Sequence, residues 1–134
     1  INLVQRYRLG QKVKFIDHCK EMPVAYSLAD IVISASIEPE AFGRVSVEAQ
    51  AMGKPIIASN LGGSKETILD GKSGFLYKHD DPRELAKSLN AVIELDQDHL
   101  NSIGNEGRKN VIKKFDVELM CDSTLREYKK LLNI

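Results

Sequence analysis

Several features that mark particular classes of protein are scarce or missing in this sequence. Tryptophan is absent, aromatic residues make up 6% of the chain, and 19 basic residues balance 19 acidic ones. A chain with zero net charge has no overall field that attracts nucleic acid or an anionic membrane surface. Its apolar runs stay well short of the roughly 20 residues that a membrane-spanning helix needs. These absences argue against a nucleic-acid-binding protein and against a membrane-spanning one.

Cysteine is also scarce. Cys19 and Cys121 lie far apart in the sequence, and neither belongs to a CxxC pattern or to a cysteine and histidine group with metal-ligand spacing. This usage favours two reduced thiols in or near the core of a cytosolic protein over a disulfide or a metal site.

What remains is the composition of one globular domain, with 43% hydrophobic and 28% charged residues in 134. Apolar runs predict strands, and amphipathic stretches between them predict helices. Strands that alternate with helices predict an α/β fold with a parallel sheet, of the kind found in the later part of a doubly wound, Rossmann-like domain. We expect strands at 13–16, 31–36, 54–59 and 74–77, helices at 1–9, 22–29, 44–52, 82–95, 97–114 and 116–132, and a helical turn within 61–68.

One segment, SIEPEAFGRVSVEAQAM (residues 36–52), combines carboxylates with a predicted helix start. The first backbone N–H groups of that helix, from Gly43 to Ser46, have no acceptor within the helix and point to where open α/β sheets bind ligands. Glu40 precedes the helix start and Glu48 follows it. Carboxylates accept paired hydrogen bonds from vicinal hydroxyls, so this pattern is typical of a nucleotide-sugar site.

A glutamate beside a helix N-terminus also has an ordinary explanation, because it complements the helix dipole by a few tenths to about 1 kcal/mol. For a single glutamate that explanation suffices. The second glutamate, the EAFG loop and the apolar strand that follows favour binding. Glu38 is expected to lie on the loop surface.

The stretch EAFGRVSVE (40–48) resembles the E-x7-E signature of retaining GT-B glycosyltransferases of family 4, the glycosyl transferases group 1. Its surroundings are similar in the same order: LADIVISAS before it, then EAQAMGKPIIASNLGGSKETILDGKSGFLY and DPRELAKSL. The resemblance covers residues 10–132 and implies the C-terminal, donor-binding domain of a GT-B fold with a helical C-terminal tail.

The resemblance implies a role for each residue of the motif that handles the sugar. Glu40 would be the catalytic residue and would hold hydroxyls of the donor hexose. Ala41, Phe42 and Gly43 would border the sugar, with the backbone amides of Phe42 and Gly43 assisting Glu40.

It implies a second group of residues for the nucleoside. Glu48 would bind the ribose hydroxyls and Val45 would pack near the ribose and base. The backbone of Ile16 and Asp17 would border the base. Arg44 occupies a slot that varies within the family, and its side chain could simply be solvated.

The chain departs from the family pattern in one respect. The Arg and Lys that bind the diphosphate in the family have no match here, and neither has the acceptor-binding N-terminal domain. We therefore expect residues 1–134 to be a fragment that lacks the first βα units and is inactive when isolated. The alternatives are a non-catalytic sugar-nucleotide-binding subunit and a GT-B epimerase or phosphorylase.

The resemblance implies a UDP- or GDP-type sugar as substrate, no metal or other cofactor, and a cytoplasmic location. Asp96-Gln97-Asp98 has the letters of a DxD metal motif, but the pattern predicts a helix start there. Gly62-Gly63 is predicted to be a tight turn. The basic stretch RKNVIKKF (108–115) favours a solvated helix face, with peripheral membrane contact as the alternative.

Overall fold

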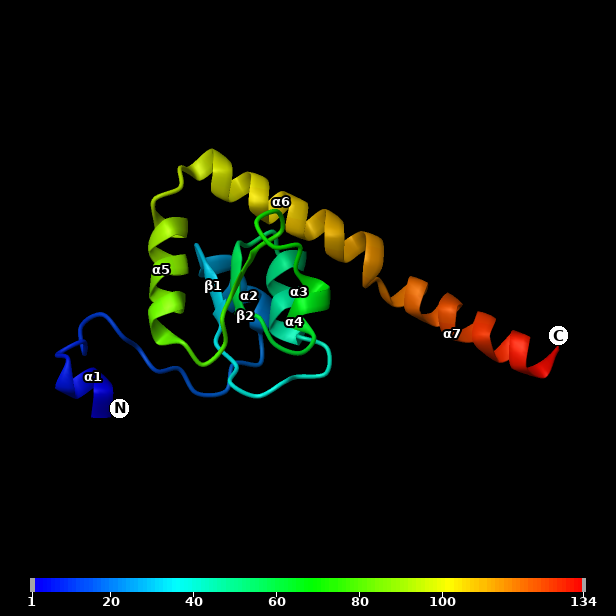
Figure 1. The fold of residues 1–134 in the computed structure, drawn as a ribbon, viewed down its shortest axis with the longest axis horizontal. Helices are drawn as coiled ribbons and strands as arrows, with labels where there is room; N and C mark the ends of the chain where they lie inside the picture. Colours follow the sequence, from blue (N-terminus) through cyan, green and yellow to red (C-terminus); the bar gives the residue numbers. More distant parts are fainter. Residues whose placement is uncertain (1, 134) are drawn as a thin grey trace.

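The computed structural model describes residues 2–133, which form seven helices and three strands (Figure 1). The helices are α1 (Asn2–Arg6), α2 (Met22–Leu28), α3 (Arg44–Ala51), α4 (Ser64–Thr67), α5 (Pro82–Ile93), α6 (Gln97–Lys114) and α7 (Val117–Leu132). The strands are β1 (Val32–Ser34), β2 (Ile56–Ser59) and β3 (Phe75–Tyr77).

The sheet is parallel and its strand order is β1-β2-β3. Ile57 of β2 lies opposite Ile33 of β1 and Phe75 of β3, and all four residues of β2 are buried. Continuous burial of a central parallel strand requires helices on both faces of the sheet. The predicted α/β fold with a parallel sheet is thus confirmed.

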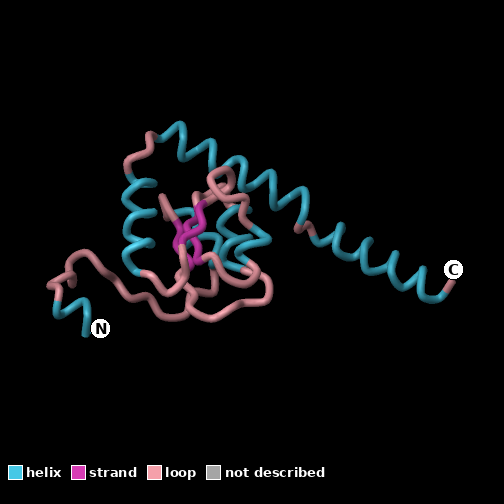
Figure 2. The backbone as a smooth tube through the Cα atoms, in the orientation of Figure 1, coloured by secondary structure: helices cyan, strands magenta, loops and turns pink. Residues whose placement is uncertain are grey.

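Alternate residues of β2 enter two separate cores. Ile56 and Ala58 pack with Tyr26 of α2 and Ala49 of α3, whereas Ile57 packs on the opposite face with Val92 of α5. Figures 1 and 2 show the result, with α5 on one side of the sheet and α2 and α3 on the other. This layering exposes the ends of the strands, where ligands bind in such folds.

Helices α3 and α6 pack closely because small residues meet at their crossing. A Cβ placed on Gly104 of α6 would overlap the carbonyl group of Gly53, which follows α3. Buried Gln50 joins the same region to α4, because its Nε2 donates to the carbonyl oxygens of Ser46 (3.0 Å) and Thr67 (2.9 Å). Asn110 of α6 donates to the Thr67 carbonyl as well, at 2.9 Å.

Helices α5 and α6, in the second half of the chain, begin at acidic capping residues that the sequence indicates. Asp81 accepts hydrogen bonds from the Arg83 and Glu84 amides at the start of α5, and Asp96 accepts one from the His99 amide at the start of α6. Short acidic side chains at this position satisfy N–H groups that have no partner within the helix. The interpretation of Asp96 as a helix-start residue is therefore confirmed.

The prediction of a strand at 13–16 is wrong. These residues carry no regular secondary structure, and Phe15 and Ile16 are exposed. A strand is held by hydrogen bonds to a neighbour, and within the described part of the chain no strand pairs with this segment. The first helix is also shorter than predicted: it ends at Arg6, before Gly10, and residue 1 lies outside the described residues.

Helix α7 extends away from the rest of the chain (Figure 1), and none of its residues is buried. Cys121 on α7 is accordingly exposed, contrary to the expectation of a place in or near the core. Cys19 is half-buried, and both cysteines are free thiols as predicted.

Candidate nucleotide-sugar site

Two loops meet at the carboxyl edge of the sheet. The loop 35–43 follows β1 and contains the EAFG stretch, whereas the turn around Gly62 and Gly63 follows β2. The Gly63 amide donates to the Glu40 carbonyl oxygen at 2.9 Å, which joins the two loops directly. The backbone of Glu40 is therefore anchored at the edge where parallel sheets bind ligands.

The two glycines of this turn leave room for the EAFG loop. A Cβ on Gly62 would lie 2.8 Å from the Glu40 amide nitrogen, and one on Gly63 would overlap the backbone of Phe42. The predicted tight turn is confirmed. Because neither glycine has a side chain, the EAFG loop can also pack against the start of α4.

Gly43 caps α3 in the left-handed conformation, with φ of 79° and ψ of 51°, which glycine adopts without strain. No side chain among the described residues 2–133 caps this helix start. The amides of Arg44, Val45 and Ser46 lie in the first turn, where the helix supplies no acceptor and the helix dipole favours negative charge. The side chains of Ser46 and buried Ser64, 3.3 Å apart, link α3 to α4 behind this turn.

Glu48 lies one turn further along α3, and both of its carboxylate oxygens are engaged. The Tyr26 hydroxyl donates to Oε2 at 2.9 Å, and Nη2 of Arg44 donates to Oε1 at 3.0 Å. The Glu48 side chain remains 34% exposed, so the carboxylate is held in place and still reachable. Sequence reasoning missed Tyr26, because nothing in MPVAYSLA distinguishes it from a core residue.

A cleft of about 410 Å³ adjoins Glu48. Its lining comes from α2, α3 and the segment before α2, and consists of Lys20, Met22, Pro23, Tyr26, Arg44, Glu48, Ala51 and Met52. Ile16 and Asp17 are exposed and are not among the lining residues of the described chain. Their role beside the base stays a prediction.

The remaining motif residues divide between loop and core. Glu40 is half-buried, and Ala41 and Phe42 are exposed. The Phe42 ring packs edge-on against Phe115 at the junction of α6 and α7, with 5.6 Å between the ring centroids. Val45 is half-buried and packs against the core on the α3 side of the sheet. Glu38 is exposed, as expected for a residue on the loop surface.

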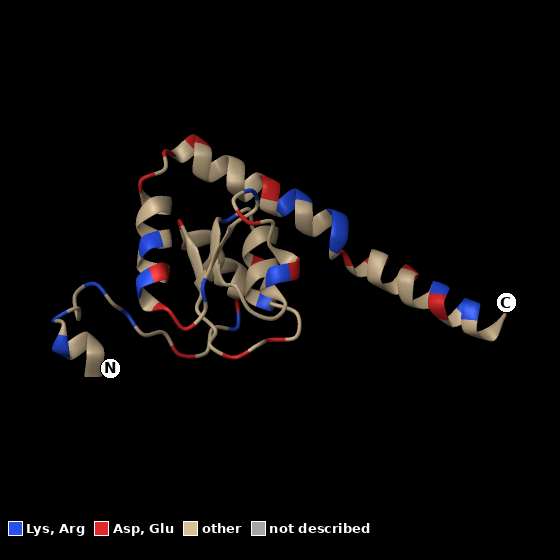
Figure 3. Ribbon diagram, viewed as in Figure 1, with Lys and Arg blue, Asp and Glu red and all other residues tan. Residues whose placement is uncertain are grey.

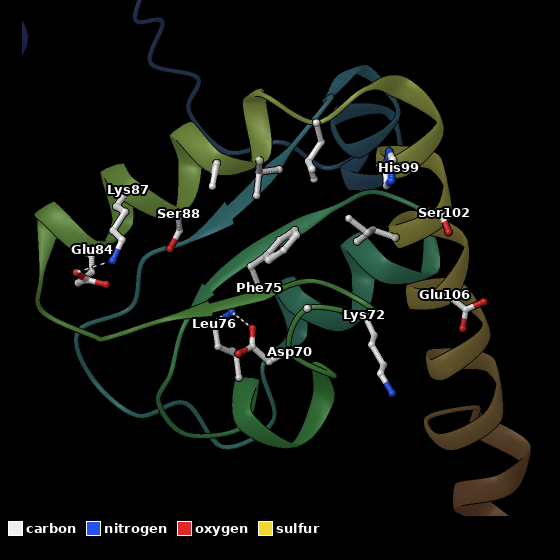
Figure 4. Close-up of a pocket in the computed structure, with 15 residues that line it drawn as sticks. Asp70, Lys72, Phe75, Leu76, Glu84, Lys87, Ser88, His99, Ser102 and Glu106 are labelled. Carbon is white, nitrogen blue, oxygen red and sulfur yellow. Dashed lines mark hydrogen bonds and ion pairs between the residues drawn. The ribbon is translucent and has the colours of Figure 1, made fainter.

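A larger groove, of about 730 Å³, lies elsewhere, between β3, α5 and α6 (Figure 4). Its lining includes Asp70, Lys72 and Phe75, at the amino end of β3 and in the turn before it. It includes neither Glu40 nor Glu48. Asp70 fills part of this edge, because its Oδ1 accepts a hydrogen bond from the Leu76 amide at 2.8 Å. The two features that favour a nucleotide sugar are the N-terminus of α3 and the carboxylates of Glu40 and Glu48, and both lie outside this groove.

Asp96 and His99 form a local pair at the start of α6, outside the site. His99 Nδ1 lies 2.7 Å from Asp96 Oδ1, and the hydrogen bonds from His99 lower the pKa of the Asp96 carboxyl.

Among residues 2–133, no cluster of three or more His, Cys, Asp or Glu is arranged to hold a metal ion. None of the helices in the described chain is long and apolar enough to cross a membrane.

Basic residues gather at the C-terminal half of α6 (Figure 3). Arg108 donates to the Ala51 carbonyl oxygen at 2.8 Å, and Lys109 pairs with Glu106 at 2.7 Å. Two members of the basic stretch thus have roles within the chain. Peripheral membrane contact of this stretch stays a prediction.

Comparison with known proteins identifies the family. Residues 1–110 match the family described as glycosyl transferases group 1. The chain belongs to this family.

Two solved structures and one curated relative illustrate how similar this glycosyl transferases group 1 chain is to known proteins. The structure of Anabaena Alr3699/HepE in complex with UDP-glucose superimposes with a TM-score of 0.89 at 31% identity, over 96% of this chain and 35% of that one. The C-terminal domain of a group 1 family protein from Francisella tularensis gives a TM-score of 0.74 at 28% identity, over 87% of this chain and 60% of that one. The capsular polysaccharide biosynthesis glycosyltransferase CapM of Staphylococcus aureus is 33% identical over 93 residues, 69% of this chain and 24% of CapM.

These comparisons confirm the predicted family and fold. The group 1 chain has the parallel sheet and long C-terminal helix of a GT-B C-terminal domain. It spans about a quarter of the length of the curated relatives it matches.

Proposed function

We propose that this chain forms the donor-binding part of a retaining glycosyltransferase. Its substrate would be a nucleoside diphosphate sugar, with the sugar beside Glu40 and the N-terminus of α3 and the ribose beside Glu48. The observation that carries the proposal is the Glu48 carboxylate, which two side chains hold and which adjoins a cleft. It lies one turn from a helix start that no side chain of residues 2–133 caps. HepE, which binds UDP-glucose in its structure, supports the substrate class.

The chemistry follows from these groups. Transfer breaks the bond between the sugar anomeric carbon and the diphosphate oxygen, and forms a bond from that carbon to an acceptor hydroxyl oxygen with the same configuration. The leaving nucleoside diphosphate takes the bonding electrons, and the acceptor hydroxyl loses its proton. The amides in the first turn of α3, which have no acceptor within the helix, would stabilise the negative charge that develops on a diphosphate bound at this helix N-terminus.

Glu40 and Glu48 have separate tasks in this proposal. Glu40 orients the hexose by accepting hydrogen bonds from its hydroxyls, and Glu48 positions the nucleoside through the ribose diol. The diphosphate would also need cationic groups from the rest of the full-length protein, which would include the acceptor-binding domain. On family membership we further propose that the protein works in the cytoplasm.

Alanine substitutions in the full-length protein test the assignment. We expect Glu40→Ala and Glu48→Ala each to lower the rate of sugar transfer by at least about 100-fold, because each removes a charged hydrogen-bond acceptor for the substrate. Glu48→Ala should also weaken binding of the nucleoside diphosphate alone, measured by calorimetry, whereas Glu40→Ala should leave it nearly unchanged.

Glu38→Ala is the matched control, since Glu38 lies in the same loop and is exposed. It should transfer sugar at the unaltered rate. Normal transfer by both the Glu40 and Glu48 variants would refute the assignment. Donor binding without transfer to any hydroxyl acceptor would instead favour a sugar-nucleotide-binding subunit.

A further inference from the structure

We propose that Tyr26 is a positioning residue for nucleotide binding. Its hydroxyl fixes the Glu48 carboxylate, with help from Arg44, in the orientation that receives the ribose hydroxyls. This inference rests on the proposed function, because it requires Glu48 to be the ribose ligand.

The geometry leaves the carboxylate both fixed and available. Tyr26 donates to Oε2 at 2.9 Å and Arg44 donates to Oε1 at 3.0 Å, so each oxygen accepts one hydrogen bond from the protein. An ionised carboxylate has about four acceptor positions, two on each oxygen. One position therefore remains on each oxygen, which matches the two adjacent hydroxyls of a ribose.

The two donors are not equivalent. The Arg44 side chain is 82% exposed and lies one helical turn from Glu48. Such an ion pair does little to hold the Glu48 carboxylate in place, because water competes for both charges. Tyr26 is 5% exposed, and its ring packs in the core with Ala49 and Ile56. A hydroxyl on a ring packed in the core has few alternative positions, so we assign the main role in orienting Glu48 to Tyr26.

The protonation state of Tyr26 suits this role. Burial, followed by the hydrogen bond to Glu48, raises the pKa of the Tyr26 hydroxyl to about 12. The hydroxyl therefore keeps its proton at every pH at which the protein is expected to work, and it always donates to Glu48. Because the ring spans from α2 to α3, it also sets the distance between Glu48 and the cleft wall contributed by α2.

A plain structural role is the competing explanation. A tyrosine in a core needs some acceptor for its hydroxyl, and removal of the hydroxyl would then affect stability alone. The two explanations differ in how Tyr26 and Glu48 combine. If Tyr26 acts through Glu48, its hydroxyl has no effect on nucleotide affinity once the carboxylate is gone.

A double-mutant cycle in the full-length protein separates them. The variants are Tyr26→Phe, Glu48→Ala and the two combined, and calorimetry measures the Kd for UDP and for GDP. We expect Tyr26→Phe to raise the Kd of the nucleotide that binds by about tenfold. We expect Glu48→Ala to raise it further, and the double variant to match Glu48→Ala.

Tyr77→Phe is the matched control. Tyr77 is 6% exposed but packs on the opposite face of the sheet, with Ile57 and Val92. Its variant also loses a buried hydroxyl, and its Kd should equal that of the unaltered protein.

A ribose-specific measurement gives a second test that needs only the single variant. The unaltered protein should bind UDP or GDP more tightly than the 2′-deoxy form, and Tyr26→Phe should lose most of that preference. An equal loss of affinity from Tyr26→Phe with and without Glu48, or an unchanged preference for the 2′-hydroxyl, would overturn the role of Tyr26. Unaltered nucleotide affinity in Glu48→Ala, or no binding of UDP or GDP by the unaltered protein, would instead overturn the proposed function.

Discussion

Gly63→Ala gives a test in which two physical arguments predict opposite signs. Gly63 has φ of −61° and ψ of −22°, which alanine adopts readily. Considered only as backbone, the change should stabilise the protein by about 0.4–1 kcal/mol, since alanine restricts the unfolded chain. The added methyl group, however, would overlap the carbonyl group and Cα of Phe42.

The steric effect should prevail. The atoms in the way are backbone of the EAFG loop, which cannot rotate aside as the end of a long side chain can. Overpacking of this kind costs about 1–3 kcal/mol. For a chain of this length, a loss of 2 kcal/mol corresponds to a Tm lower by roughly 7 °C. The hydrogen bond from the Gly63 amide to the Glu40 carbonyl should be displaced in the same movement.

Thermal unfolding and calorimetric binding of a nucleotide sugar measure the two consequences. We expect Gly63→Ala to melt at a lower temperature and to bind the nucleotide sugar more weakly, with the affinity for the nucleoside diphosphate less affected. Gly10→Ala is the control, because a Cβ there meets nothing within 4 Å. A Gly63→Ala protein that melts at or above the temperature of the Gly10→Ala protein would refute the steric argument.

Two further predictions concern stability. Gln50→Met should lower the free energy of unfolding, measured in urea, by about 1–2 kcal/mol, because the Gln50 amide donates to two buried carbonyl oxygens. The same change at exposed Gln97 should have little effect. Equal losses of stability in the two variants would contradict the prediction. The raised pKa of Tyr26, about 12 against the ordinary 10.0, means that the unfolded chain ionises first as the pH rises. The contribution of the protonated Tyr26 to stability is therefore complete below pH 10 and is lost between pH 10 and 12, up to roughly 2–3 kcal/mol. The Tyr26→Phe protein should lose less stability across that window than the unaltered protein. An identical dependence of stability on pH in the two proteins would contradict the raised pKa.

Local signals in the sequence were enough to predict most helices. The range of α6, Gln97–Lys114, matches the prediction, because Asp96 caps it through bonds within the same segment. Helix α5 begins as predicted at Pro82, after Asp81. Caps and prolines act over three or four residues, so their effect can be predicted without knowledge of the remaining chain.

Features that depend on distant residues could not be predicted in this way. The apolar run at 13–16 has the composition of a strand, but a strand forms only where a neighbour offers hydrogen bonds. Likewise, Tyr26 lies 22 residues before Glu48 in sequence, and no spacing rule joins them. The glycines at 62–63 predict a turn by themselves, but the contact of this turn with the EAFG loop depends on the fold.

The two glutamates of the motif are held in different ways, and this difference bears on how the proposed site would work. Glu48 has its carboxylate fixed by two side chains, whereas Glu40 is anchored through its backbone carbonyl, and no hydrogen bond within residues 2–133 involves its carboxylate. A ligand that meets a fixed group loses less binding energy to ordering than one that meets a mobile group. Under the proposed function, the nucleoside would thus bind to a prepared site, and the Glu40 side chain would take its final orientation from the sugar. Replacement of the donor's sugar by a different hexose should then change the rate of transfer more than the affinity for the donor, because the nucleoside end supplies most of the preorganised contacts.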